Sequence, residues 1–318
     1  MLYRAARHLR LGLGVRLFAM SVEHPLPGRR APMETLDRNR ALLAQATGYV
    51  YKEVAGHELA AWVFKPENRP ASTPLPAILF FFSSSWDSGL VSQFAPHCLH
   101  LAQRGMVAMT VEYRTSSQHG AGPLDAMADA RSAVRWARRH ATELGVDPLR
   151  LAGAGGSAGA HAILTAAMLR EKEYDSPSDP SDQSCVPDAL ILFDPLVDIN
   201  EIRPGRKFNI SSFPSRHAAR QASPLRRVRS KLPPMLLMHG TTDRILPFEA
   251  TRAFAKKMRR WFRRNDCRLI PYEGCGHSFF NFNVNPQLFE ATVIQMDKFL
   301  VEKGFIEPTP AADNDCEI

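Results

Sequence analysis

The 318-residue chain is 45% hydrophobic and 23% charged, with a net charge of +8 from 40 Lys and Arg against 32 Asp and Glu, and these values exclude a disordered or collagen-like protein. The longest unbroken hydrophobic runs, such as Ala77–Phe82, are far shorter than the ~20 residues of a membrane-spanning helix, so no stable membrane insertion is expected. The length allows two domains or one large α/β domain.

The first 45 residues are predicted to be a basic N-terminal extension. Residues 1–40 carry eight arginines against three acids. Residues 1–22 have the arginine content of a targeting segment, but Arg16 interrupts the hydrophobic stretch and no A-x-A-like cleavage site follows. A cytoplasmic location is therefore expected, and a secreted or periplasmic one if residues 1–22 act as a signal. Cleavage of the extension stays open.

From residue 46 to residue 306 the pattern predicts one domain, followed by an acidic tail at 307–318. Gly48–Val54 and Glu58–Phe64 show partial alternation and end at Pro66, which favours an antiparallel edge ribbon. Short hydrophobic runs follow, each bounded by turn residues, as in strands buried on both faces of a parallel sheet. These runs are Ala77–Phe82, Met106–Tyr113, Leu149–Ala154, Ala189–Phe193, Met235–His239 and Cys267–Tyr272.

Stretches with hydrophobic residues three and four apart lie between these strands and predict helices. Strand and helix alternate, so we expect a doubly wound, mostly parallel α/β sheet. Two segments do not fit the alternation: Tyr174–Asp188 is predicted as an exposed loop, and residues 199–234 as a small cap or insertion. The helices are expected at Gln93–Arg104, Leu124–Leu144, Ala158–Glu171, Pro247–Arg264 and Gln287–Lys303, the last introduced by Asn285-Pro286.

The insertion is strongly basic, since residues 202–231 hold nine Lys and Arg and no acid. Solvated helix and loop faces explain this charge, because no nucleic-acid-binding motif accompanies it. No nucleic-acid partner is expected, while an anionic part of a small substrate would be tolerated. The five cysteines are widely spaced without a C-x-x-C pair, so neither a disulfide scaffold nor a metal site is predicted.

The strongest chemical signal is the G-x-S-x-G sequence Gly155–Gly159, which stands directly between a predicted strand and a predicted helix. This context favours a nucleophile elbow, in which Ser157 sits on a strained turn at the carboxyl edge of the sheet. Glycines leave no side chain to collide with the neighbouring strand. Ser157 is therefore predicted to be a nucleophile.

A serine nucleophile needs a base and an acid that orients the base. After a nucleophile elbow, these residues are expected on loops that follow later strands, in the chain order Ser, acid, His. Asp243 and His277 follow the strands that end at His239 and Tyr272. Asp194 and Asp198, one strand earlier, are alternative acids. The alternative bases are His161, on the helix that follows the serine, and His239.

With these motifs the chain resembles the α/β-hydrolase fold, and within it the carboxylesterases and acetyl esterases akin to hormone-sensitive lipase. The resemblance runs from about Pro76 to Leu300. It is carried by the elbow and by the segments 77–82, 111–114, 129–136, 239–243 and 276–280. It implies hydrolysis of small carboxylic esters without a cofactor, with Ser157, Asp243 and His277 as nucleophile, acid and base.

One segment departs from these relatives, which usually carry H-G-G-G and an aromatic residue after the third strand. Here the aligned residues are Phe82, three serines and Trp86. The backbone N–H groups of Ser84, Ser85 and Ala158 are predicted to form the oxyanion hole. A serine that needs a positive φ would strain this loop, and loss of one oxyanion donor lowers turnover roughly 10²–10³-fold.

We expect a serine esterase acting on small, short-acyl esters. A prolyl-oligopeptidase-like peptidase and a catalytically impaired binding protein on the hydrolase scaffold are the alternatives. Trp86 and Phe279 flank the predicted site as candidate pocket residues, although packing beneath the loops explains them equally well. Arg114 and Asp129 are expected to form a structural ion pair. The sequence leaves the physiological ester and the oligomeric state open.

Overall fold

Eight strands form one sheet in the computed structural model, which describes residues 33–67, 73–170, 172–177, 179–180, 182–199, 212–260 and 262–308. The predicted leader 1–22, residues 200–211 of the insertion and residues 309–318 of the tail lie outside this description. The strands are β1 (Thr47–Val54), β2 (His57–Phe64), β3 (Leu75–Phe81), β4 (Val107–Val111), β5 (Val146–Gly156), β6 (Ala189–Phe193), β7 (Met235–Gly240) and β8 (Cys267–Tyr272).

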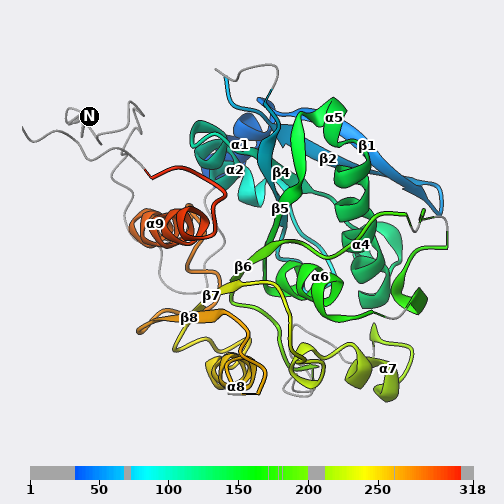
Figure 1. Cartoon of the computed structure of the whole chain (residues 1–318), viewed down its shortest axis with the longest axis vertical. Coiled ribbons are helices and arrows are strands. Elements are labelled where there is room, and N and C mark those ends of the chain that lie inside the picture. Colours follow the sequence, from blue (N-terminus) through cyan, green and yellow to red (C-terminus); the bar gives the residue numbers. More distant parts are fainter. Residues whose placement is uncertain are drawn as a thin grey trace, which may run out of the picture.

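The strand order is β1-β2-β4-β3-β5-β6-β7-β8 (Figure 1). β1 pairs antiparallel with β2, and β2 pairs antiparallel with β4. The pairs from β4 through β3, β5, β6 and β7 to β8 are parallel. The edge ribbon and the mostly parallel sheet are therefore confirmed, and the carboxyl ends of six neighbouring strands share one edge.

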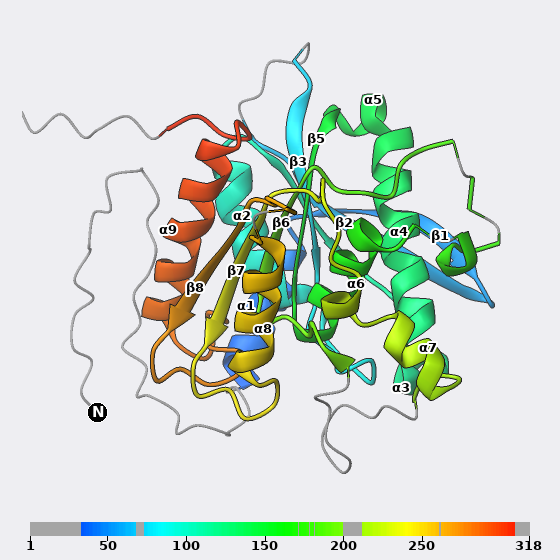
Figure 2. The ribbon, with the colours of Figure 1, turned by 60° about the horizontal axis from the view of Figure 1, so that its bottom comes forward.

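The helices cover both faces of the sheet, with α2 and α9 on one side and α4 and α6 on the other (Figure 2). The 3₁₀ segment η1 (Val91–Phe94) precedes α2, and η5 (Pro224–Arg226) lies in the insertion. The described helices are α1 (Met33–Leu43), α2 (Ala95–Gln103), α3 (Ser116–His119), α4 (Pro123–Arg139), α5 (Ala141–Leu144), α6 (Ser157–Met168), α7 (Arg216–Gln221), α8 (Phe248–Met258) and α9 (Pro286–Glu302).

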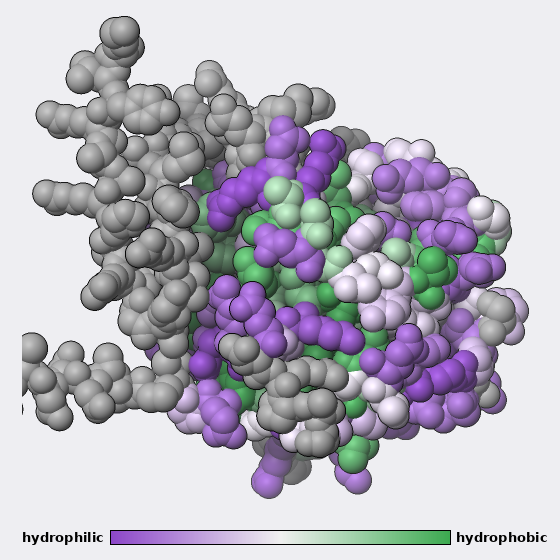
Figure 3. Space-filling view, turned by 90° about the horizontal axis from the view of Figure 1, so that it is seen from above, coloured by the Kyte–Doolittle hydropathy of each residue, from purple (hydrophilic) through white to green (hydrophobic). Residues whose placement is uncertain are grey.

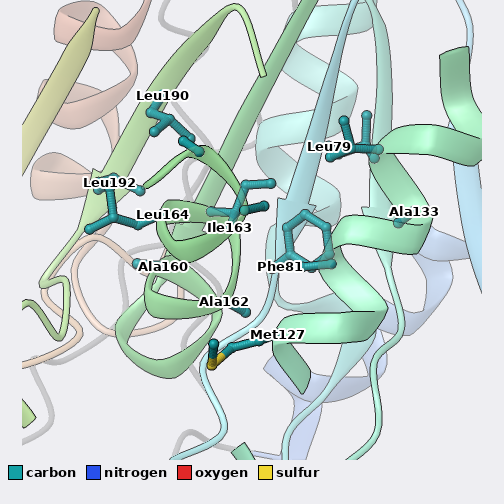
Figure 4. Packing of buried hydrophobic residues seen from close by; sticks show 14 of the residues in the cluster. Leu79, Phe81, Met127, Ala133, Ala160, Ala162, Ile163, Leu164, Leu190 and Leu192 are labelled. Atoms are coloured by element: carbon teal, nitrogen blue, oxygen red, sulfur yellow. The ribbon is translucent and has the colours of Figure 1, made fainter. Parts of the chain in front are cut away.

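Alternate residues of the central strands enter two hydrophobic cores, as the pleat of a strand requires. Leu79 and Phe81 of β3 pack toward α4 and α6, beside Met127 and Ile163 (Figure 4). Ile78 and Phe80 of the same strand point to the other core, formed with α2 and α9. Strands buried on both faces explain why their sequences read as continuous hydrophobic runs.

Helix boundaries differ from the prediction most clearly in two places, while α2 and α6 differ from the predicted bounds by three residues or fewer. The helix expected at Leu124–Leu144 breaks at His140 into α4 and α5, and the one expected at Pro247–Arg264 ends at Met258. Met258 is the last buried residue of α8, so the arginines beyond it have no hydrophobic face to bury. α9 begins as expected: Pro286 is its first residue, and the Asn285 side chain accepts a hydrogen bond from Leu288 N.

The segment 174–188 is predicted to be an exposed loop, and this prediction is wrong at both ends, since Cys185 near its second end is also buried. Tyr174 and Ser176 are buried. Arg131 and Arg135 of α4 both bind the Asp175 carboxylate, at 2.5 Å and 2.8 Å. These ion pairs hold the polar loop against α4. The pattern of hydrophobic residues cannot predict this packing, because the contacts are ionic.

None of the described helices is both long and hydrophobic enough to cross a membrane. The face seen in Figure 3 carries hydrophilic side chains interspersed with hydrophobic ones. Most large hydrophobic side chains are instead in the two cores.

Candidate active site

Ser157 lies at the sharp turn between β5, which ends at Gly156, and α6, which begins at the serine. Its φ of +54° is uncommon for a residue with a side chain and marks a strained turn. A Cβ on Gly159 would come within 2.2 Å of the Phe81 carbonyl oxygen, and one on Gly155 within 2.7 Å of the Gly159 backbone. The glycines of the motif are thus required by the close packing of α6 against β3 and β5.

His277 and Asp243 reach Ser157 from the loops that follow β8 and β7. The Ser157 Oγ donates to His277 Nε2 at 3.1 Å, and His277 Nδ1 donates to Asp243 Oδ2 at 2.6 Å. His277 lies 120 residues after Ser157 and 34 residues after Asp243 along the chain. The three side chains meet because the strands before them end at one edge of the sheet. The arrangement can transfer a proton from the hydroxyl to the imidazole.

The Asp243 carboxyl is held in its ionised form. Burial alone raises its pKa, but hydrogen bonds from His239 and His277 outweigh this effect, and the net pKa is well below the ordinary value. Its Oδ1 also accepts the backbone N–H groups of Ile245 and Leu246, at 2.7 Å and 2.9 Å. A negative charge is therefore fixed beside the imidazole.

The alternative acids and bases have other partners. Asp198 accepts a hydrogen bond from Ser223 Oγ at 3.0 Å. His161 is fully buried and donates from Nε2 to the Ala222 carbonyl at 2.9 Å, and burial lowers its pKa to about 4. His239 Nε2 lies 3.2 Å from Asp243 Oδ2. Asp194 is nearer the centre, with its Oδ2 3.8 Å from His277 Nδ1.

The loop after β3 carries the predicted oxyanion donors. Ser85 and Trp86 have φ values of +55° and +61°, which is the strained conformation that a serine in place of glycine was expected to bring. Within the described part of the chain, no hydrogen bond occupies the backbone N–H of Ser84 or Ser85. Ala158 is in the first turn of α6, where backbone N–H groups have no partner within the helix.

A chain of hydrogen bonds within the hydrophobic core holds this loop. Tyr113 Oη donates to the Phe82 carbonyl at 2.6 Å, so the 2.7 Å contact between Ser84 Oγ and Tyr113 Oη must use the serine proton. Ser84 Oγ in turn accepts the Trp86 N–H at 2.9 Å. Sequence reasoning missed this role of Tyr113, although the residue stands in the segment 111–114 that carries the resemblance.

Gln93 connects the loop to the region after His277. Its Oε1 accepts the Ser83 N–H at 2.6 Å, and its Nε2 donates to Ser83 Oγ at 3.2 Å and to Asn281 Oδ1 at 2.8 Å. The Ser83 N–H is thereby engaged, unlike those of the next two residues. Nothing in the spacing of Gln93 and Asn281 along the sequence indicates this bridge.

Both candidate pocket residues are buried. Trp86 is 2% exposed and packs edge-on against His161 and Phe213, with ring centroids 5.4 Å and 5.3 Å away. Phe279 is 3% exposed and packs against Tyr272 at 4.5 Å. Phe213 belongs to the insertion, so the described part of the insertion packs on the oxyanion loop through Trp86.

The expected ion pair between Arg114 and Asp129 is confirmed. Arg114 Nε and Nη2 each donate to an Asp129 oxygen at 2.9 Å, and Lys52 Nζ lies 2.7 Å from the same carboxylate. Asp129 is fully buried, and its charge is matched by two cations. The pair stabilises the packing of α4 against β1 and the end of β4.

One surface pocket of about 350 Å³ lies on the insertion, and a second of about 270 Å³ lies between the insertion and the end of α6. Arginines dominate their walls, and neither is lined by Ser157 or His277. In the described part of the chain, Asp194, His239 and Asp243 have potential metal-ligand atoms within 4.8 Å of one another. These atoms already take part in the hydrogen bonds of the site.

Comparison with known proteins gives one family and several relatives. The BD-FAE family model matches residues 63–258. Esterase LipC of Mycobacterium tuberculosis is 25% identical over 273 residues, covering 82% of this chain and 66% of LipC. The probable carboxylic ester hydrolase LipM of the same organism is 28% identical, covering 58% of this chain and 45% of LipM. The chain thus spans two thirds or less of these relatives.

Among solved structures, Thermogutta terrifontis esterase 2 phosphorylated by paraoxon is similar with a TM-score of 0.77 and 38% identity. The match covers 84% of this chain and 97% of the esterase. The same esterase with propionate bound matches at 37% identity, also with a TM-score of 0.77. The chain therefore has the α/β-hydrolase fold of an esterase.

Proposed function

Because the chain belongs to the BD-FAE family, we propose that it is a serine hydrolase that cleaves small carboxylic esters. The observation that supports this most directly is the hydrogen-bonded series from Ser157 through His277 to Asp243. Such a series converts a weakly nucleophilic hydroxyl into one that can attack an ester carbonyl.

In the proposed reaction His277 Nε2 takes the Ser157 proton while the serine oxygen bonds to the carbonyl carbon. Asp243 holds the imidazole with its Nδ1–H toward the carboxylate and stabilises the imidazolium that forms. The tetrahedral oxyanion lies against the N–H groups of Ala158, Ser84 and Ser85. When the C–O bond to the alcohol breaks, the imidazolium gives its proton to the leaving oxygen. A water molecule deprotonated by the same imidazole then releases the acid.

We further propose that the enzyme prefers esters with short acyl chains and that it belongs with the acetyl esterases of the hormone-sensitive-lipase-like group. The related Thermogutta esterase 2 has been solved with propionate and with butyrate bound, which supports a small acyl site. Trp86 and Phe279 follow the proposed oxyanion donors and the proposed base in the chain, and we place them at the border of that site. Their burial by other aromatic side chains would leave little depth for a long acyl chain.

The test compares hydrolysis of p-nitrophenyl acetate, butyrate and octanoate by the wild type and by Ser157→Ala. We expect activity on the two shorter esters and its loss in the variant. Ser88→Ala, an exposed serine of the oxyanion loop, is the matched control and should retain activity. Equal background rates in the wild type and Ser157→Ala would instead favour a binding protein on the hydrolase scaffold, for which the strained φ values of Ser85 and Trp86 are the favouring observation.

A further inference from the structure

We infer that Asp194 is a positioning residue of this active site, which ties together the loops of the acid and the base and offers the His277 imidazole a second carboxylate. The inference rests on the proposed function. Asp194 directly follows β6 and is fully buried. It stands one strand before the strand that delivers Asp243.

Each carboxylate oxygen of Asp194 binds a different loop. Oδ1 accepts the backbone N–H of Gly240 at 3.1 Å, at the end of β7 and shortly before Asp243. Oδ2 accepts the backbone N–H of Ser278 at 2.7 Å, directly after His277. One rigid group thus sets the separation of the two loops, and through them the separation of the acid and the base. Burial raises the pKa of the Asp194 carboxyl, while the His277 and His239 imidazoles and the Gly240 N–H act in the opposite direction. Both backbone N–H bonds favour the ionised carboxylate.

The backbone is strained at both ends of the shorter bond. Asp194 has a φ of +40° and Ser278 a φ of +68°. Residues with a side chain hold such conformations only where the surrounding structure requires them, and these positions concentrate at functional sites. Here the required feature is the direct bond from the β8 loop to the carboxylate.

Asp194 also approaches the imidazole itself. Its Oδ2 lies 3.8 Å from His277 Nδ1, while Asp243 Oδ2 lies at 2.6 Å. The other titratable groups that face this centre are His239, whose Nε2 is 4.0 Å from Asp194 Oδ1, and Cys275 on the β8 loop. His239 Nε2 donates to the Leu246 carbonyl, which fixes its proton on that nitrogen. Asp194 is therefore the second negative charge beside the His277 imidazolium.

The consequence is clearest when Asp243 is replaced by asparagine. The new amide can keep the Oδ1 bonds to Ile245 and Leu246, but its NH₂ then faces His277 Nδ1 and favours the tautomer that cannot accept the Ser157 proton. Residual activity requires a proton on Nδ1, for which Asp194 Oδ2 is the remaining carboxylate acceptor. The remaining activity of Asp243→Asn should therefore depend on Asp194.

The experiment measures kcat and KM for p-nitrophenyl acetate against pH in the wild type, Asp194→Asn, Asp243→Asn and the double variant. We expect Asp194→Asn to lower kcat about tenfold with KM nearly unchanged. Its acid limb should move to lower pH, because removing a negative charge makes the imidazolium easier to deprotonate. In the Asp243→Asn background the same change should cost about a hundredfold. The matched control Asp198→Asn, on the same loop, should leave both quantities unchanged.

An acid limb of Asp194→Asn that coincides with the wild type, together with equal losses in both backgrounds, would overturn the inference and leave a purely structural tie. Wild-type activity no greater than that of Ser157→Ala would instead overturn the proposed function, so the two failures are distinguishable. If Asp194→Asn does not fold, the His277 imidazole is titrated by NMR in Asp243→Asn alone. A pKa at or above the ordinary ~6.5 supports the second carboxylate, and a value below it contradicts it.

Discussion

Tyr113→Phe removes one hydroxyl beneath the oxyanion loop and leaves its ring in place. That hydroxyl donates to the Phe82 carbonyl and accepts from Ser84 Oγ, and Ser84 in turn holds the Trp86 N–H. The ring itself is buried and stacks on Phe82 with centroids 4.3 Å apart. The substitution therefore acts on the hydrogen bonds and not on the packing.

The expected loss of stability follows from the buried groups left without a partner. The Phe82 carbonyl loses its donor and the Ser84 hydroxyl loses its acceptor, and each such group costs about 1–3 kcal/mol. Because the Ser84 hydroxyl can rotate, we expect about 2 kcal/mol in total, or a fall in Tm of roughly 4 °C for a domain of this size. The loop carrying the Ser84 and Ser85 donors would lose its anchor, and turnover should fall roughly 10²-fold, the lower end for one lost oxyanion donor.

Thermal unfolding and p-nitrophenyl acetate kinetics measure both effects. Tyr51→Phe is the matched control, because Tyr51 is also buried and its hydroxyl donates to the Glu112 carbonyl at 2.7 Å, not to a residue of the oxyanion loop. The control should lose comparable stability and keep its kcat. Equal kcat in Tyr113→Phe and Tyr51→Phe would refute the claim that Tyr113 positions the oxyanion donors.

Other substitutions test the packing, the buried charges and the response to pH. Gly159→Ala would bring a Cβ within 2.2 Å of a backbone carbonyl oxygen. It should abolish esterase activity and lower the free energy of denaturant unfolding by about 3 kcal/mol. The Cβ of Gly276→Ala meets open space, so this control should fold normally. Arg114→Met leaves the buried Asp129 carboxylate short of one cation and should lower the free energy of chemical unfolding by about 3 kcal/mol. Arg252→Ala, which breaks an exposed ion pair, should lower it by less than about 1 kcal/mol. Equal losses in the two variants would contradict this. His97 is buried with neither ring nitrogen bonded in the described structure, and burial lowers its pKa to about 3. Folding therefore favours the neutral imidazole, and the free energy of unfolding should decrease as pH falls from about 6.5 toward 3. His97→Phe should raise Tm at pH 7 and make Tm depend less steeply on pH in acid. An unchanged pH dependence of Tm would contradict the lowered pKa of His97.

Much of the fold could be predicted from the sequence because the central strands are buried on both faces. Continuous hydrophobic runs such as those of β3 and β6 leave few alternatives, and the G-x-S-x-G turn fixes which strand precedes the serine. Asp243 and His277 could be proposed because parallel strands bring their carboxyl ends to one edge of the sheet. That rule requires only the order of the strands, not their contacts.

The contacts that hold the site could not be predicted in the same way. Ser84 and Tyr113 follow the neighbouring strands β3 and β4, and their bond depends on side-chain direction rather than on spacing. Asp194 could be recognised as a candidate acid from its place after β6, but its two backbone bonds appear only once β7 and β8 are aligned beside it. The early end of α8 depends on which residues remain buried, which the charge-rich periodic pattern conceals.

If Ser157 is a nucleophile activated by His277, an organophosphate should label it covalently. The chain is incubated with paraoxon, and the site of phosphorylation is located by mass spectrometry of the intact protein and its peptides. We expect one phosphoryl group per chain on Ser157, none in Ser157→Ala, and much slower labelling in His277→Ala. Labelling of another residue, or an equal rate in Ser157→Ala, would contradict it.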